Sequence, residues 1–395
     1  METRTRGAGW ARWVAPWALG FLVACTAVAP RQAAPSAPPP GATAPAAATP
    51  AATAPAAAAA ARPALATSPV VDLKVNALPI AAWAPYYIAQ ERGYFRDVGL
   101  NVEFAVTSNT VEALPSLAQG QIQVGNCASA VACFNALNRG TDMKIVADMQ
   151  SAGKTAKSDG NVALVVRKDL WDNGTVRTPQ DLVGRSIYNV AGPGSASYIQ
   201  AARWLLSNGV DPHSIDWPLM PFPDQLAAML NKGIEVSIET EPLVTAGVER
   251  GAFEIMATQE AMYPTTQVLY VMYWGGIDRL GQQVGERFMV AHLRAVRAYI
   301  DAFEYGVDQD AIIKILTDNT TIKDPAVWKQ IKYSWVDPNG VVNRAALEAD
   351  AELLRQLGLL QTAVDLAPAF DDHYREFAVR YLGEYQPPAG APASR

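Results

Sequence analysis

The chain has 395 residues, of which 50% are hydrophobic and 18% are charged, and its net charge is −6 at neutral pH. It contains no long basic run and no alternation of basic and aromatic residues, so nucleic-acid binding is disfavoured. After the first 25 residues no segment is long and apolar enough to predict a helix that spans a membrane.

The first 25 residues have the layout of a secretory signal peptide. Three arginines precede an apolar segment, residues 13–24, which is shorter than the ~20 residues that a membrane span needs. Residues 22–25, Leu-Val-Ala-Cys, resemble the bacterial lipobox, in which the chain is cut before the cysteine and the sulfur receives lipid. We therefore expect an extracytoplasmic lipoprotein, at the cell surface or in the periplasm, held to the membrane only by lipid on Cys25. A transmembrane helix is the alternative.

The next segment, residues 26–70, has a very biased composition. It contains 21 Ala and 10 Pro and no aromatic residue. Prolines spaced through alanines prevent a continuous helix, and nothing in the segment can build a core. We expect a disordered, semi-extended tether, with the folded part starting near residue 71. The remaining length is too great for one ordinary lobe and suits two.

Strands and helices are predicted to alternate from residue 71 onward. Each strand is a short apolar run, and the helices stop near glycines at positions 99, 120 and 140. We expect residues 71–170 to form the first part of lobe 1. Its predicted strands are residues 73–78, 101–106, 123–126 and 144–149, with a fifth at 161–167 that leads out of the lobe. Its predicted helices run over 85–97, from Thr110 to Gly120, and from the third strand to Gly140.

The alternation restarts after residue 170, which predicts lobe 2 over residues 171–264. Strands that alternate with short helices indicate parallel sheets covered by helices. A strand at 267–274 is expected to return to lobe 1, so that residues 265–395 complete that lobe, with helices from Glu286 onward. In lobe 2 we expect strands at 185–190, 215–220, 235–240 and 253–258, and helices at 196–208, 224–231 and 242–250.

The expected fold is therefore α/β, with two lobes, a ligand cleft between them and C-terminal helices. In open α/β sheets, ligands bind beyond the carboxyl ends of the strands. We expect a ligand to bridge the two lobes and to stabilise a closed form. The segments near 165–180 and 262–270 are the predicted hinges.

The candidate binding residues lie just after predicted strands or at the starts of helices. Two small-residue helix starts, 127–129 and 192–197, offer free backbone amides to a ligand, unless their serines only cap the helices. Trp83, with Tyr86 or Tyr87, can supply a flat wall, with core packing as the alternative. Glu241 can bind a ligand, bond a hinge or cap the next helix. The full set is Trp83, Tyr86, Asn109, Cys127, Ala128, Ser129, Gly194, Ser195, Ser197, Phe222 and Glu241.

Two cysteines remain besides Cys25, at positions 127 and 133. An exported protein permits a disulfide between them. A six-residue loop at the junction of a strand and a helix is, however, a demanding geometry for one. We therefore expect two buried free thiols and keep the disulfide as the alternative.

Four segments together resemble a known family. Residues 81–95, AAWAPYYIAQERGYF, look like the opening motif of the ABC-transporter substrate-binding proteins for nitrate, sulfonates, taurine and thiamine pyrimidine precursors. Residues 181–185 resemble that family's start of the second lobe, and residues 205–211 its Leu-x-x-x-Gly-x-Asp turn. The Glu241-Pro242 pair lies where the family often has an acidic residue before proline. The resemblance implies the two-lobed type II periplasmic binding protein fold. It also implies a receptor, monomeric by default and without a cofactor, that passes a small solute to an ABC permease and ATPase.

The class of solute is predicted from the charges at the strand ends. No Arg or Lys lies directly there, whereas two glutamates do. A bare oxyanion usually attracts arginine, although backbone amides can replace it. We expect a small organic solute, either sulfonate- or taurine-like, or an aromatic or heterocyclic molecule such as a thiamine pyrimidine precursor.

An enzyme is a rival interpretation with little support. The histidines at 213, 292 and 373 have no neighbours at metal-ligand spacing, so no metal site is expected. Ser195 and Ser197 lack the Gly-x-Ser-x-Gly elbow of hydrolases. The fungal pyrimidine synthases resemble the same family, but residues 127–133 lack their consecutive cysteines. A sensor or adhesion lipoprotein on this fold is a third interpretation.

Overall fold

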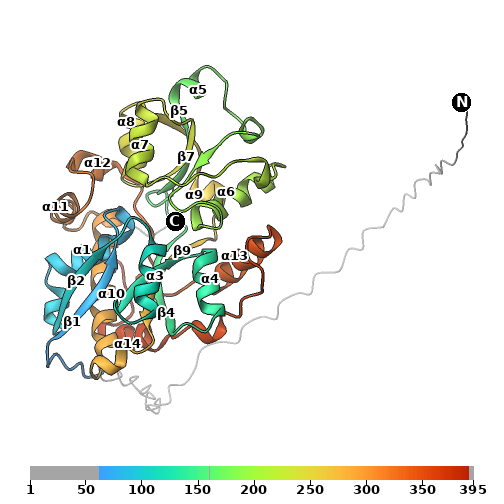
Figure 1. The fold of residues 1–395 in the computed structure, drawn as a ribbon. Coiled ribbons are helices and arrows are strands. Elements are labelled where there is room, and N and C mark those ends of the chain that lie inside the picture. The colour runs from blue at the N-terminus through green and yellow to red at the C-terminus, as the bar shows by residue number, and fades with distance from the viewer. Residues whose placement is uncertain (1–61, 160, 391–395) are drawn as a thin grey trace, which may run out of the picture. The chain divides into compact units, whose positions relative to one another are not determined.

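The computed structural model describes residues 62–159 and 161–390. Within them the strands form two sheets, one in each lobe (Figure 1). The predictions for Cys25, for the signal peptide and for most of the tether fall outside the described residues. Among the described residues, no helix has the length and apolar character needed to cross a membrane.

The first sheet has five strands in the order β2-β1-β3-β9-β4. β1 pairs in parallel with β2 and β3, whereas β9 runs antiparallel between β3 and β4. β9 enters from the second lobe, at the edge where the parallel strands end, so it must run the opposite way. The strands are β1 (Val71–Ala77), β2 (Leu100–Val106), β3 (Val124–Ala128), β4 (Met143–Ser151) and β9 (Gln267–Trp274).

Short helices connect the strands of the first sheet. The side chain of Asn109 caps one of them by accepting hydrogen bonds from the backbone N–H groups of Val111 and Glu112. Gly93, at φ 73°, separates two helices where the sequence predicted one continuous helix. The helices are η1 (Ala81–Trp83), α1 (Ala84–Glu91), α2 (Tyr94–Asp97), α3 (Thr110–Ala118) and α4 (Val131–Asn138).

The second sheet has four strands in the order β6-β7-β5-β8. β5 is antiparallel to both neighbours, and β6 is parallel to β7. The strands are β5 (Val162–Arg167), β6 (Ile187–Tyr188), β7 (Val236–Thr240) and β8 (Phe253–Thr258). The helices are α5 (Lys168–Asp172), η2 (Pro179–Leu182), α6 (Ala196–Ser207), η3 (Pro212–Ser214), α7 (Phe222–Leu230), α8 (Leu243–Glu249) and α9 (Gln259–Met262).

The strand predicted at residues 215–220 is not a regular strand. The segment makes only isolated parallel bridges, Ser186 with Asp216 and Asn189 with Leu219. Pro218 has no N–H group, so it can accept from Asn189 but cannot donate to the ladder. The apolar pattern therefore identified a segment beside the sheet but not its interrupted pairing.

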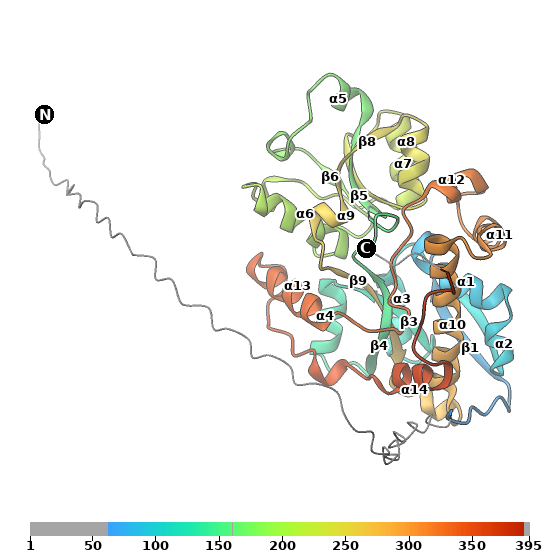
Figure 2. The same cartoon turned by 180° about the vertical axis from the view of Figure 1, so that it is seen from behind.

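The C-terminal part is helical, as predicted. The long helix α10 is buried along most of its length and packs against α1 and α14. The segment made of α11 and α12 reaches both lobes, because α11 contacts α1 and α12 contacts α8. Helix α13 also reaches both lobes, because it lies beside α4 and α6 (Figures 1 and 2). The helices are η4 (Ile277–Leu280), α10 (Val284–Tyr305), α11 (Gln309–Asn319), α12 (Pro325–Gln330), α13 (Arg344–Gln356), η5 (Ala367–Ala369) and α14 (His373–Leu382).

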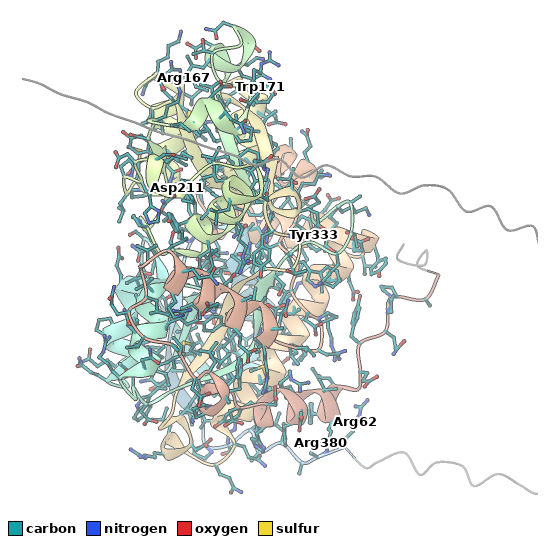
Figure 3. All side chains as sticks on the ribbon, turned by 90° about the vertical axis from the view of Figure 1, so that its right-hand side faces the viewer. Arg62, Arg167, Trp171, Asp211, Tyr333 and Arg380 are labelled. Atoms are coloured by element: carbon teal, nitrogen blue, oxygen red, sulfur yellow. A yellow bond between two sulfur atoms is a disulfide. The ribbon has the colours of Figure 1, made fainter. Side chains whose placement is uncertain are left out.

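The chain crosses between the sheets twice. It leaves the first sheet after Ser151, joins the second at Val162, and returns between Thr258 and Gln267. Sheet membership therefore puts the first crossing before the predicted boundary at residue 170. The hinge predicted at 165–180 is also displaced, because Arg167 and Trp171 lie at the end of the second lobe far from the first (Figure 3). The hinge predicted at 262–270 does overlap the return crossing.

Cys127 and Cys133 form a disulfide, which corrects the prediction of two free thiols. Cys127 lies in β3 and Cys133 in α4, and their Cα atoms are 6.3 Å apart, within the usual range for a disulfide. The prediction treated the connecting loop as too tight. In the structure α4 begins at Val131, so its first turn carries Cys133 back over the end of the strand.

Candidate functional site

A cavity lies in the cleft between the two lobes. Its volume is about 80 Å³. At roughly 10–15 Å³ for each water, this space suits a small solute rather than a polymer. Its walls are mainly aliphatic and aromatic, with a few amides and hydroxyls. The lining residues are Leu78, Ile80, Trp83, Asn109, Thr110, Val111, Ala128, Ala130, Gln150, Val162, Val190, Ala191, Ser195, Ala196, Ser197, Gln200, Phe222, Thr240, Val268 and Leu269.

On the first-lobe side, three of the candidate binding residues line the cavity, namely Trp83, Asn109 and Ala128. Trp83 ends η1 and is 1% exposed, and its indole N–H donates to Oδ1 of Asn126 at 3.2 Å. Its polar atom is therefore already bonded within the lobe, and the ring offers an apolar face. Because Trp83 also belongs to the buried core, its removal would weaken the fold as well as the cavity wall.

On the second-lobe side, Ser195, Ser197 and Phe222 line the cavity. Ser195 caps α6 by accepting from the N–H of Tyr198 at 3.3 Å, and its hydroxyl donates to the carbonyl of Gly192 at 2.9 Å. The capping role that we weighed against ligand contact therefore applies to Ser195. Ser197 is bonded only to the Ser195 hydroxyl, at 3.2 Å, so its oxygen keeps free capacity.

Three other predicted residues are buried beside the cavity without lining it. Tyr86 packs in the core, accepts from the amide of Asn126 at 3.1 Å, and stacks edge-on against Phe288. Cys127 is held in the disulfide. Ser129 donates to the carbonyl of Gln267 at 2.7 Å, which joins β3 to β9. These three side chains shape the wall from behind.

Glu241 does not line the cavity either, because its carboxylate serves the polypeptide. It accepts from the N–H and the hydroxyl of Thr245 at 2.9 and 2.8 Å, at the start of α8, and from the N–H of Lys332 at 3.2 Å. The helix-capping role of Glu241, together with the bond from Lys332, thus occupies both of its oxygens. Burial raises the pKa of this carboxyl to about 7, although the bonds from Thr245 oppose the shift.

Gly194 lies where the two lobes touch. Its carbonyl accepts from the N–H of Val131 at 2.9 Å, so the turn before α6 meets the start of α4 across the cleft. Its φ is +80°, and a Cβ atom there would lie 2.6 Å from Cγ2 of Val131. Further round the cleft, Arg203 of α6 donates to the carbonyl of Ala349 in α13 at 2.7 Å. The structure is therefore a closed arrangement of the lobes.

Two lining residues outside the candidate set carry amide atoms that have no partner in the described part of the chain. Gln200 is fully buried, and among residues 62–159 and 161–390 neither its nitrogen nor its oxygen has a hydrogen-bond partner; the same holds for Nε2 of Gln150. Unpaired buried amides are uncommon and favour a further polar partner. Gln200 was detectable in principle, since it follows Ser197 by three residues and so shares its helix face. Gln150 comes directly after the strand predicted at 144–149, although it is not in the candidate set; in the structure it lies within β4.

No side chain that lines this cavity carries a charge. Burial, with the neighbouring Glu241 as a smaller cause, holds the pKa of Glu239 well above its ordinary value, which disfavours the charged form of that carboxyl. Among residues 62–159 and 161–390 there is no group of three or more His, Cys, Asp or Glu suited to a metal ion. The site can therefore enclose a small apolar body with a few hydrogen bonds.

Comparison with known families decides what kind of chain this is. A family model described as NMT1/THI5 like matches residues 81–301, more than half of the 395-residue chain. The chain belongs to the NMT1/THI5-like family. The matched range contains every cavity-lining residue of this NMT1/THI5-like protein except Leu78 and Ile80.

Solved structures share the fold at low sequence identity. The alkanesulfonate-binding protein SsuA from Xanthomonas axonopodis pv. citri, bound to MOPS, is 18% identical, with a TM-score of 0.62 over 77% of this chain and 99% of that one. The periplasmic nitrate-binding protein NrtA from Synechocystis PCC 6803 is 14% identical, with a TM-score of 0.64 over 82% of this chain and 92% of that one. The two-lobed periplasmic binding protein fold is thereby confirmed.

A curated relative agrees with this family. The bicarbonate transport ATP-binding protein CmpC of Synechococcus elongatus is 22% identical over 284 residues, 68% of this chain. The match spans only 40% of the length of CmpC. The resemblance expected from residues 81–95 is confirmed by the family match. The names of these relatives describe binding proteins and a transport component rather than enzymes, in agreement with the prediction that the chain is not an enzyme.

Proposed function

We propose that this NMT1/THI5-like protein is an extracytoplasmic solute-binding protein that captures a small organic solute and delivers it to an ABC permease and ATPase. The observation that carries the proposal is the cavity in the cleft, whose walls come from both lobes. Closure of two lobes around a solute couples occupancy to the shape of the protein. A transporter can use that difference to select the loaded form.

The names of the relatives support this role. SsuA is an alkanesulfonate-binding protein, NrtA a nitrate-binding protein, and CmpC a bicarbonate transport ATP-binding protein. Their solutes differ in size and charge, so we carry over only the shared role of binding for transport. The permease and ATPase partners, and a monomeric state, are part of the proposal.

The proposed solute is sulfonate- or taurine-like, or an aromatic or heterocyclic molecule such as a thiamine pyrimidine precursor. Its proposed contacts are the predicted residues that line the cavity, namely Trp83, Asn109, Ala128, Ser195, Ser197 and Phe222. The uncharged lining favours the heterocyclic class, because a buried anion usually recruits arginine or several N–H donors. We also propose that the chain is organised in four parts, which are the tether, the first part of lobe 1, lobe 2 and the return to lobe 1.

We further propose that lipid on Cys25 holds the protein to the outer face of a membrane. The support is the lipobox-like sequence at residues 22–25, followed by a tether rich in alanine and proline. A Cys25→Ser variant should move from the membrane fraction to the soluble fraction. Retention of that variant in the membrane fraction would contradict the lipid anchor.

A thermal-shift panel on the full chain tests solute binding. The panel holds alkyl and aryl sulfonates, taurine, nitrate, bicarbonate, aromatic carboxylates and aminopyrimidines. A solute that binds only the folded state raises the melting temperature. At a concentration a hundred times its Kd, it adds about 2.7 kcal/mol to the free energy of unfolding. We expect at least one organic member to do so. A flat response over the whole panel would contradict capture of these solute classes.

Two serines of α6 provide matched variants for the same panel. Ser197 lines the cavity, whereas Ser207 is exposed at the other end of the helix. Ser197→Ala should reduce the thermal shift given by the binding solute, and Ser207→Ala should leave it unchanged. Equal shifts in both variants would show that the solute binds elsewhere.

A further inference from the structure

Phe222 stands between two hollows of the cleft. The first is the cavity described above, and the second is a groove of about 280 Å³ measured in the same way. Leu78, Ile80 and Phe222 line both hollows, so they form the partition between them. The groove lies toward solvent, since Val106 on its wall is 62% exposed. Its other lining residues are Pro79, Thr107, Ser108, Pro221, Pro223 and Thr321.

The three residues of the partition differ in how firmly they are held. Leu78 and Ile80 are 4% and 6% exposed and belong to the main core cluster. Phe222 is only half-buried and packs against the edge of that cluster at the first position of α7. Phe222 is therefore the part of the partition that can be removed without opening the core.

The chain on either side of Phe222 fixes its position. Pro221 and Pro223 flank it, and each proline ring restricts its own backbone angle φ. The backbone that carries the Phe222 side chain therefore has little conformational freedom. The benzyl side chain makes no hydrogen bond that would be broken by a solute. It acts as a fixed apolar wall at the outer end of the cavity.

We propose that Phe222 sets the length of solute that the cleft accepts. This inference rests on the proposed function. A cavity of about 80 Å³ has room for roughly five to eight water molecules, at about 10–15 Å³ each, so only a short solute fits inside it. A longer apolar body meets the Phe222 ring. Without that ring the cavity and the groove form one channel, in which Val106 and Pro223 supply apolar surface for the added length.

The test is isothermal titration of the full chain with two homologous series, straight-chain primary amides and alkanesulfonates of two to ten carbons. Wild-type affinity should rise with length until the solute fills the cavity and then fall at least ~10-fold. In the Phe222→Ala variant this fall in affinity should disappear. Affinity should instead rise about fourfold for each further CH₂ that is buried. Leu219→Ala is the control, because Leu219 is 60% exposed nearby and lines neither hollow.

A second variant checks where the added length lies. Val106→Ser, introduced into Phe222→Ala, should weaken binding of the longest members and leave the shortest unchanged. An identical length profile in wild type and Phe222→Ala overturns the inference, as does a wild type that prefers the ten-carbon members. Failure of both series to bind also overturns it, whereas the proposed function stands or falls on the solute panel and its serine variants.

Discussion

Glu241 joins three parts of the protein through its carboxyl group and its backbone carbonyl. It bonds the start of α8 through Thr245 and the segment after α12 through Lys332, while its backbone carbonyl accepts from the N–H of Ala81 at 3.3 Å. The residue therefore connects the second lobe to the opening helix of the first. Because the group is buried, its ionisation affects the stability of the whole closed form.

The sign of that effect follows from the raised pKa. Between pH 4.5, the ordinary value, and about pH 7, the folded protein keeps a proton on Glu241 that the unfolded chain releases. The free energy of unfolding therefore falls as the pH rises through this window, by up to about 1.4 kcal/mol per pH unit for one such group. Asp148 and Asp350, whose pKa burial also raises to about 7, add the same sign.

We predict that the melting temperature of the full chain falls from pH 5 to pH 7.5 and that Glu241→Gln makes this fall shallower. Thermal unfolding at half-unit pH intervals measures both slopes. Glu348→Gln, at an exposed position of α13, is the control and should keep the wild-type slope. A Glu241→Gln slope equal to that of wild type would contradict the assignment.

For single residues, the sequence predicted which ones lie near the cleft better than it predicted which partners their side chains bind. Ser195, Ser197 and Phe222 do line the cavity, because residues beyond strand ends and at helix starts face the cleft. Tyr86 and Ser129 occupy similar positions in the sequence but point to partners inside the lobe. Which way a side chain points depends on the neighbouring element, and no local pattern contains that information.

Among the elements, the turn before α6 controls how closely the lobes approach. Gly194 permits the contact with Val131, since any Cβ atom there would clash with Cγ2 of that residue. We predict that Gly194→Ala weakens solute binding by holding the lobes apart. Affinity for the solute found in the panel, measured by isothermal titration, should fall about tenfold or more if closure loses roughly 1.4 kcal/mol.

A second glycine separates backbone strain from this clash. Gly184 has a φ of +76°, close to the +80° of Gly194, but a Cβ atom there would meet nothing within 4 Å. Gly184→Ala should therefore cost about 1–2 kcal/mol of stability through the backbone and leave affinity unchanged. Equal losses of affinity in both variants would contradict the role of the turn in closure.

The sequence predicted most elements of both sheets, because hydrophobic alternation and glycine stops are local signals. It failed where two segments had to be combined. Pro218 breaks the pairing of a segment that has the apolar content of a strand. The disulfide depends on where α4 begins relative to β3, which spacing alone does not define.

For the whole molecule, two crossings and the C-terminal helices hold the lobes around one cavity. The crossings run between Ser151 and Val162 and between Thr258 and Gln267, and α13 packs against both lobes. The two-lobed architecture was predictable because the alternation of strands and helices restarts. The first crossing was misplaced because β5 follows the strands of the first lobe in sequence without a break in pattern.

The most direct measurement is a crystal structure of the chain with the solute that binds best in the panel. We expect electron density for the solute inside the cavity, between Trp83 and Ser197, with the contact between Gly194 and Val131 still formed. Density on an outer surface, or a solute held by one lobe while the cleft stays open, would show that this protein does not enclose its solute between the lobes.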